Sequence, residues 1–178
     1  MEYLGPTLDP VSSAQGTRVV PDRLYDDFCE TDLLLVPGGH GTRALVNDSA
    51  FIDWLKQAGL QSKIVTSICT GSALLAQAGL LENHRATSNK RAFTWVSTLG
   101  KNVIWEPSAR WVHDGTRWTS SGVAAGIDMA AAIIAKLVGE SERDEACRRA
   151  EIVITKNPAN NTFAARPLGF QKGSKNSP

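Results

Sequence analysis

Cys69 stands where the chain passes from a predicted strand into a predicted helix with no loop between them. Residues 63–67 (KIVTS) are typical of a buried strand, and helical spacing begins at about residue 70, with Gly71 in the turn. A strand–turn–helix junction of this kind turns a nucleophilic side chain outward. The unpaired amides and the positive dipole end of the helix also favour the thiolate, which is the reactive form of cysteine. The pattern leaves a second interpretation open, in which Cys69 is a small packed core residue.

A glycine-rich segment, residues 37–42 (PGGHGT), follows another apolar run, residues 32–36 (DLLLV). Glycines at a strand end let backbone N–H groups approach a ligand, and beside a nucleophile such groups form an oxyanion hole. The segment has neither the Lys-Ser/Thr ending of a phosphate-binding loop nor the third glycine of a dinucleotide-binding fingerprint. An oxyanion hole and a plain turn therefore remain as the two interpretations.

A third small-residue segment, residues 119–128 (TSSGVAAGID), joins a predicted strand to a predicted helix. This small-residue turn either lies beside a site at the strand end or is a closely packed helix-capping turn.

The histidines and cysteines do not have the spacing of metal ligands. His40, His84 and His113 form no HxxxH or HExxH pattern, and the three cysteines are widely spaced with no CxxC pair. We therefore expect no metal and no other cofactor, and structural roles for Cys29 and Cys147. The cysteine usage and the lack of a recognisable leader predict a reduced, cytoplasmic compartment.

Strand-like and helix-like segments alternate along the chain, which predicts an α/β fold with a mostly parallel sheet and helices on both faces. The predicted strands are residues 18–20, 32–36, 63–67, 86–88 and 103–105, followed by a hairpin of 110–113 and 118–120 around Asp114 and Gly115. The predicted helices are residues 50–58, 70–78, 90–98, 127–138 and 142–154. We expect the strand at 32–36 to be buried on both faces. Ligands in such folds bind at the carboxyl ends of the strands, where Cys69 and the glycine-rich segment both lie.

Length and composition fit one globular domain. The 178 residues are 42% hydrophobic and 21% charged, with a formal net charge of +1. This balance gives no electrostatic case for nucleic acid or an anionic membrane as the main partner. No apolar run reaches the roughly 18 residues of a membrane-spanning helix. We expect residues 1–165 to form a single α/β domain and residues 166–178 to form a loose polar tail.

Four motifs occur in a fixed order along the chain. They are residues 35–39 (LVPGG), 66–72 (TSICTGS), 85–87 (RAT) and 119–129 (TSSGVAAGIDM). Together they resemble the ThiJ/PfpI superfamily of class I glutamine-amidotransferase-like proteins. Within it, the motifs are most similar to the isocyanide (isonitrile) hydratase branch and its fungal relatives. The resemblance covers about residues 7–165.

The resemblance implies a flavodoxin-like sheet, a homodimer and a nucleophilic Cys69. It implies that the Gly39 and His40 backbone amides face the thiolate and any developing negative charge. It also implies that Thr70 hydrogen-bonds near the reacting group, with the neighbouring turns lining the pocket. Besides Cys69 and Thr70, the implied oxyanion-hole and pocket residues are Gly38, Gly39, His40, Asn89, Ser121, Gly122 and Val123.

The chain departs from the family pattern at three places. Protease-like members have His directly after the cysteine, where this chain has Thr70, so a Cys-His peptidase is disfavoured. Many members have His where this chain has Asn89, which cannot shuttle a proton near neutral pH. Members also begin earlier, with a strand and a helix that supply an acidic residue beside the cysteine. By this comparison we expect the strand and the helix to be missing here, with nothing in the sequence to place Glu2 or Asp9 at the site. We therefore also expect an exposed sheet edge.

The favoured interpretation is a cysteine-dependent hydratase or lyase of small electrophilic molecules that converts isocyanides into N-formamides. One alternative is a glyoxalase- or deglycase-like action on 2-oxoaldehydes. Another is a non-catalytic redox or small-molecule sensor, because an exposed thiolate is readily oxidised.

Overall fold

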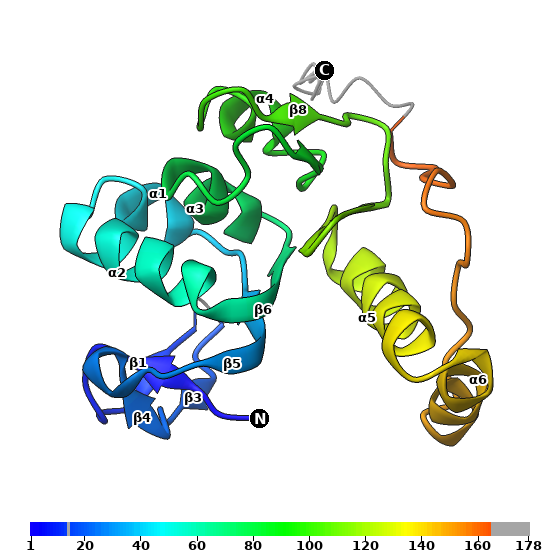
Figure 1. Cartoon of the computed structure of the whole chain (residues 1–178), viewed down its shortest axis with the longest axis horizontal. Coiled ribbons are helices and arrows are strands. Elements are labelled where there is room, and N and C mark those ends of the chain that lie inside the picture. The colour runs from blue at the N-terminus through cyan, green and yellow to red at the C-terminus, as the bar shows by residue number, and fades with distance from the viewer. Residues whose placement is uncertain (14, 165–178) are drawn as a thin grey trace, which may run out of the picture.

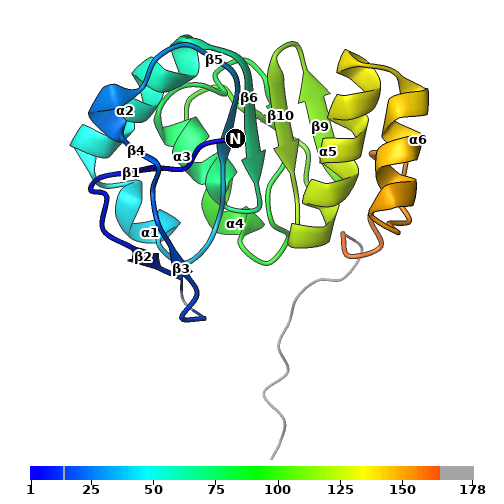
Figure 2. The same ribbon diagram turned by 90° about the horizontal axis from the view of Figure 1, so that it is seen from below.

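The computed structural model describes residues 1–13 and 15–164 (Figure 1), and its centre is a four-stranded sheet whose strands lie side by side in Figure 2. The strands of this sheet, in spatial order, are β5 (Thr31–Val36), β6 (Ser62–Ile68), β10 (Arg117–Ser120) and β9 (Trp111–Asp114). The first three strands are parallel, and β9 pairs antiparallel with β10. The mostly parallel sheet predicted from the alternation of elements is confirmed.

Shorter strands and the helices surround this sheet. The two-residue strands pair as β1 (Leu4–Gly5) with β4 (Arg23–Leu24), β2 (Val11–Ser12) with β3 (Arg18–Val19), and β7 (Arg85–Ala86) with β8 (Ile104–Trp105). The α-helices are α1 (Thr42–Leu45), α2 (Ser49–Leu60), α3 (Gly71–Gln77), α4 (Phe93–Val96), α5 (Val123–Leu137) and α6 (Glu140–Arg149), and a 3₁₀ turn covers Tyr25–Asp27.

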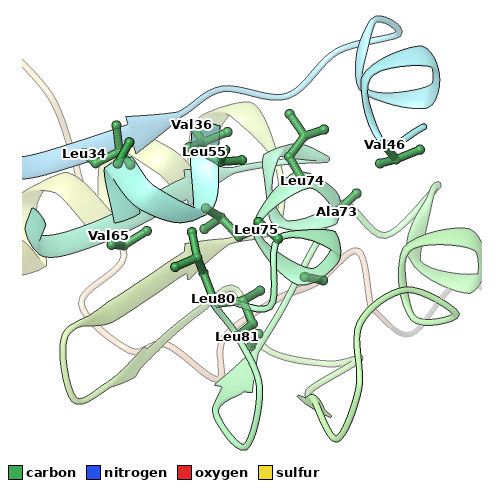
Figure 3. Close-up of a cluster of buried hydrophobic side chains, with 14 of the residues drawn as sticks. Leu34, Val36, Val46, Leu55, Val65, Ala73, Leu74, Leu75, Leu80 and Leu81 are labelled. Carbon is green, nitrogen blue, oxygen red and sulfur yellow. The ribbon is translucent and has the colours of Figure 1, made fainter. Parts of the chain in front are cut away.

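The larger hydrophobic core lies between the sheet and helices α2 and α3. Alternation along β5 turns Leu34 and Val36 towards these helices, where they join Val65 of β6 (Figure 3). Every residue of α3 except Gln77 is buried. The first turn of α3, which follows Cys69, is therefore held by core packing rather than by the helix alone.

Helix α5 covers the opposite face of the sheet. Trp111 of β9 and Trp118 of β10 form a second buried cluster with Met129 and Ile133 of α5. Helix α6 packs against α5 on the far side from the sheet (Figures 1 and 2). Helices therefore cover both faces, as expected for this class of fold.

The expected burial of residues 32–36 on both faces is wrong for the face turned towards α5. Leu35 is 48% exposed. Its strand, β5, lies at the edge of the sheet and pairs only with β6 among the described residues. Helix α5 packs against β6, β9 and β10, which leaves the outer strand less covered. The exposed edge implied by the resemblance is thus present in this structure.

Two predicted helices are shorter than their sequence patterns indicate. The helix predicted at 90–98 is observed only as α4. The helix predicted at 142–154 begins earlier, as α6, and ends at Arg149. Glu151 has a φ of +52°, which breaks the helical path, and Val153 is 99% exposed instead of facing a neighbour.

A side-chain cap and a glycine turn define two other element ends. The Asp48 side chain accepts a hydrogen bond of 3.1 Å from the Phe51 amide and caps α2. Gly115, with a φ of +60°, closes the predicted hairpin between β9 and β10. No helix within the described residues is long and apolar enough to cross a membrane. The predicted tail at 166–178 lies outside the described residues.

Candidate functional site

Cys69 occupies the predicted junction between β6 and α3, in a conformation that few non-glycine residues adopt. Its φ is +59°, and its side chain is half-buried. The turn is tight because Gly71 begins α3 directly above the end of β5. A Cβ atom at Gly71 would lie 2.1 Å from the Val36 carbonyl oxygen. The strained backbone and the required glycine are the geometry of a nucleophile elbow.

Hydrogen bonds from neighbouring elements hold the strained backbone of Cys69. Its amide donates to the Ser120 carbonyl oxygen at 3.1 Å, which continues the pairing of β6 with β10. Its own carbonyl oxygen accepts from Ser88 Oγ at 3.0 Å and from Ser72 Oγ at 3.1 Å. The ends of β6, β7 and β10 therefore meet at the cysteine.

The glycine-rich segment after β5 packs directly on the elbow. A Cβ atom at Gly38 would lie 2.5 Å from the Thr70 amide nitrogen and 2.9 Å from Cys69 Cβ. Only glycine permits this approach. The structure therefore brings the two strand ends singled out in the sequence into contact.

Thr70 connects the same segment to the elbow through its hydroxyl group. Thr70 is 6% exposed, and its Oγ1 accepts a hydrogen bond of 2.9 Å from the Gly39 amide. Thr42 Oγ1 donates to the Gly39 carbonyl oxygen at 2.7 Å and lies 3.1 Å from Thr70 Oγ1. The Gly39 amide is thus engaged by Thr70, which differs from the expectation that it faces the thiolate. Thr70 thus holds the loop through its hydroxyl group, and its hydrogen bond near the reacting group stays a prediction.

The remaining predicted site residues differ in exposure. His40 follows Gly39 and is exposed, with its carbonyl oxygen accepting from the Arg43 amide at 3.2 Å. Gly122 is the residue before α5 and is half-buried. Val123, the first residue of α5, is 79% exposed.

Ser121 directly follows β10 and is buried in a network that secures its turn. Its amide donates to the Arg110 carbonyl oxygen at 2.8 Å, and its Oγ accepts from Asn161 Nδ2 at 3.3 Å. The Arg110 guanidinium pairs with the buried carboxylate of Asp128 at 2.5 Å. These bonds tie the turn to α5 and to the described part of the C-terminal segment.

Asn89 follows Ser88 and is half-buried. Its Oδ1 accepts a hydrogen bond of 3.0 Å from the Arg91 amide, so its side chain stabilises the local turn. It directly follows Ser88, whose Oγ bonds to the Cys69 carbonyl oxygen, and its role at the site stays a prediction.

No acidic side chain within the described residues hydrogen-bonds to the Cys69 thiol. Glu2 pairs with Arg23 at 3.2 Å instead, and Asp9 is exposed. The described part of the chain also has no group of three His, Cys, Asp or Glu side chains that could hold a metal ion.

Sequence reasoning missed the hydroxyl groups that support the elbow. Ser72 and Ser88 both donate to the Cys69 carbonyl oxygen, and Ser88 lies two residues after β7, 19 residues further along the chain than Cys69. Ser72 could have been found, because a serine at i+3 from a turn residue commonly bonds back to the backbone. Nothing in the local sequence of Ser88 indicates this partner.

Comparisons with known proteins identify the family of this chain. A sequence model of the DJ-1/PfpI family matches residues 1–136. The isonitrile hydratase of Pseudomonas putida is 37% identical over 132 residues, covering 74% of this chain and 57% of that enzyme. The HTH-type transcriptional regulator CdhR of Pseudomonas aeruginosa is 31% identical over 130 residues, covering 73% of this chain and 38% of the regulator.

A solved structure of a ThiJ/PfpI family protein has a similar fold. A ThiJ/PfpI family protein from Pseudomonas syringae has a TM-score of 0.76 and 30% sequence identity to this chain, covering 89% of it and 66% of the solved chain. This chain therefore spans less than two thirds of the length of these relatives. The match over residues 1–136 and the shared fold show that the chain belongs to the DJ-1/PfpI family.

Proposed function

We propose that the protein is a cysteine-dependent hydratase or lyase of small electrophilic molecules, and that it hydrates isocyanides to N-formamides. The observation that carries this proposal is the half-buried Cys69 in a left-handed conformation at an elbow where strand ends meet. The 37% identity to an isonitrile hydratase supports the choice of substrate class.

In the proposed reaction, the Cys69 thiolate adds to the terminal carbon of the isocyanide, and that carbon takes a proton to give a thioimidate. Water then adds to the same carbon. This addition places one proton of the water on the nitrogen. The carbon–sulfur bond then breaks as the new hydroxyl group loses its proton, which releases the N-formamide, regenerates the thiolate and replaces the proton taken in the first step. One water molecule supplies the oxygen and both hydrogens of the net reaction, so no oxidant or reductant is needed.

The hydrogen bonds of the site support a division of roles among its residues. Thr70 and Gly39 bond to each other, so we assign Thr70 a positioning role and water the role of proton source. The exposed turn at His40 is the part of the glycine-rich segment that we assign to the substrate. We assign Ser121, Gly122 and Val123 to the opposite side of the substrate site, and Asn89 to its edge. The homodimer implied by the family resemblance stays a prediction, which analytical ultracentrifugation tests.

A small-molecule sensor is a second candidate, favoured by the 31% identity to a transcriptional regulator. It predicts that Cys69 binds or is oxidised by a ligand without turnover.

The test is turnover of an alkyl isocyanide by the full chain, with the N-formamide followed by mass spectrometry. We expect product from the wild type and from Cys147→Ala, and none from Cys69→Ala. Wild type and Cys69→Ala are also incubated with methylglyoxal, with lactate as the readout, and with peroxide. If the wild type forms lactate and Cys69→Ala does not, the glyoxalase-like alternative would be favoured over isocyanide hydration. Peroxide oxidation of Cys69 without either product would favour the sensor.

A further inference from the structure

Lys90 lies in the turn between β7 and α4, in surroundings that are unusual for a lysine. Its side chain is half-buried, and its Nζ lies 2.8 Å from Thr87 Oγ1. The same amine lies 5.3 Å from the centre of the Phe93 ring. Phe93 in turn packs edge-on against Trp105 of β8, with 6.1 Å between ring centres. The amine therefore lies beside an aromatic wall formed by the Phe93 and Trp105 rings, with the Thr87 hydroxyl group next to it.

No carboxylate pairs with Lys90 among the described residues, in contrast to Lys63, whose Nζ lies 2.7 Å from Asp32. The Thr87 hydroxyl donates its proton to the Glu106 carbonyl oxygen at 2.7 Å, so its oxygen is the acceptor for the amine. Burial without a charged partner lowers the pKa of Lys90 to about 8. At pH 7, one unit below this pKa, about a tenth of the amine therefore carries a free lone pair.

The position of Lys90 connects this amine to the elbow. Thr87, its hydroxyl partner, directly precedes Ser88, whose Oγ bonds to the Cys69 carbonyl oxygen at 3.0 Å. The turn that holds Lys90 is therefore the same turn that supports the candidate nucleophile.

We propose that Lys90 is a second nucleophilic site, which takes small aldehydes as a covalently bound imine. The lone pair of Nζ adds to the carbonyl carbon, and a proton passes from nitrogen to oxygen to give a carbinolamine. Loss of water then gives the imine, so one amine and one aldehyde yield one imine and one water with no change of oxidation state. This site uses neither the Cys69 thiol nor the isocyanide reaction, and it goes beyond the proposed function.

The test is reductive methylation of the folded full chain with formaldehyde and cyanoborohydride at about pH 7, where an ordinary lysine is almost fully protonated. Peptide mass spectrometry gives the labelling rate of each lysine in the native protein, relative to the same lysine in urea. We expect this ratio to be roughly tenfold higher for Lys90 than for the exposed Lys56 and Lys136. A ratio for Lys90 at or below that of the two exposed lysines would overturn the proposal.

Two variants separate this site from the elbow. Phe93→Ala opens the aromatic wall to water, and we expect the Lys90 ratio to fall towards that of the exposed lysines. Cys69→Ala should leave the Lys90 ratio unchanged, so the labelling result is independent of the outcome of the isocyanide assay. If Phe93→Ala does not fold, Phe93→Leu is the second variant, with a smaller expected decrease. A Lys90 ratio that no folded Phe93 variant lowers would also contradict the proposal.

Discussion

The Gly39 amide donates a hydrogen bond of 2.9 Å to the Thr70 hydroxyl, which joins the glycine-rich segment to the residue after Cys69. Thr42 extends this connection through its own hydroxyl group. The loop that faces the candidate nucleophile is therefore held by threonine side chains of the elbow and of α1. This arrangement positions the loop, and it uses an amide that an oxyanion hole would otherwise require.

Removing the Thr70 hydroxyl should loosen this connection. Thr70→Val leaves the Gly39 amide without its partner, and we expect a loss of about 1–3 kcal/mol in the free energy of unfolding. Thr70→Ser keeps the hydroxyl and should stay within about 1 kcal/mol of the wild type. Urea denaturation of the three proteins measures the difference. Equal stability of the Val and Ser variants would show that the hydrogen bond does not hold the loop.

Gly71 should tolerate no side chain, because its Cβ would lie 2.1 Å from the Val36 carbonyl oxygen. We expect Gly71→Ala to destabilise the protein by about 3 kcal/mol or more, through displacement of β5 from the start of α3. Gly41→Ala is the matched control, because a Cβ there meets no heavy atom within 4 Å. Thermal unfolding compares the two variants. A Gly71→Ala protein as stable as its control would contradict the close packing at the elbow.

The ion pair of Arg110 with Asp128 should be worth far more than an exposed pair. The two side chains are 14% and 5% exposed, and Asp128 also accepts from the Thr155 amide at 2.8 Å. Asp128→Ala leaves a buried guanidinium without a partner, and we expect a loss of about 3–5 kcal/mol. Asp32→Ala removes an exposed pair with Lys63 and should cost about 0–1 kcal/mol. Similar unfolding midpoints for both variants would rule out this structural role of Asp128.

Replacing Lys90 should change how stability depends on pH. Its folded-state pKa of about 8 lies below its ordinary value of 10.5, so the unfolded chain binds more protons between these values. The free energy of unfolding of the wild type should therefore rise with pH between about pH 8 and pH 10.5. Below about pH 8, the full cost of burying the charged amine is present. We expect Lys90→Met to be more stable at pH 7, by on the order of 1 kcal/mol after discounting for solvent screening. The advantage should shrink as the pH rises towards 10, and an advantage that is independent of pH would argue against titration of Lys90.

The sequence predicts the elbow and the sheet well because both depend on local signals. A β-branched run, a cysteine and a glycine follow one another at residues 64–71, and the structure places Cys69 at the expected turn. The role of Thr70 could not be predicted in this way. Its partner, Gly39, is 31 residues away, and only the folded sheet brings them together.

The wrong expectations have related physical causes. The apolar run at 32–36 indicates a strand, but its composition does not show that Leu35 lies at an open sheet edge. The helical spacing at 142–154 continues past Arg149, where the left-handed conformation of Glu151 ends the helix. No sequence pattern indicates that Lys90 is half-buried, because its burial depends on Phe93 and on the tertiary packing of Trp105.

The most direct test of the proposed nucleophile is the alkylation rate of each cysteine at about pH 6.5, where free thiols are largely protonated. Peptide mass spectrometry compares the rate in the folded protein with the rate in urea for Cys69, Cys29 and Cys147. Cys29 is a stringent control, because it is exposed and lies 3.8 Å from the Arg23 guanidinium. We predict that folding accelerates alkylation of Cys69 and slows that of the half-buried Cys147. Folding that slows Cys69 as it slows Cys147 would contradict an activated nucleophile at the elbow.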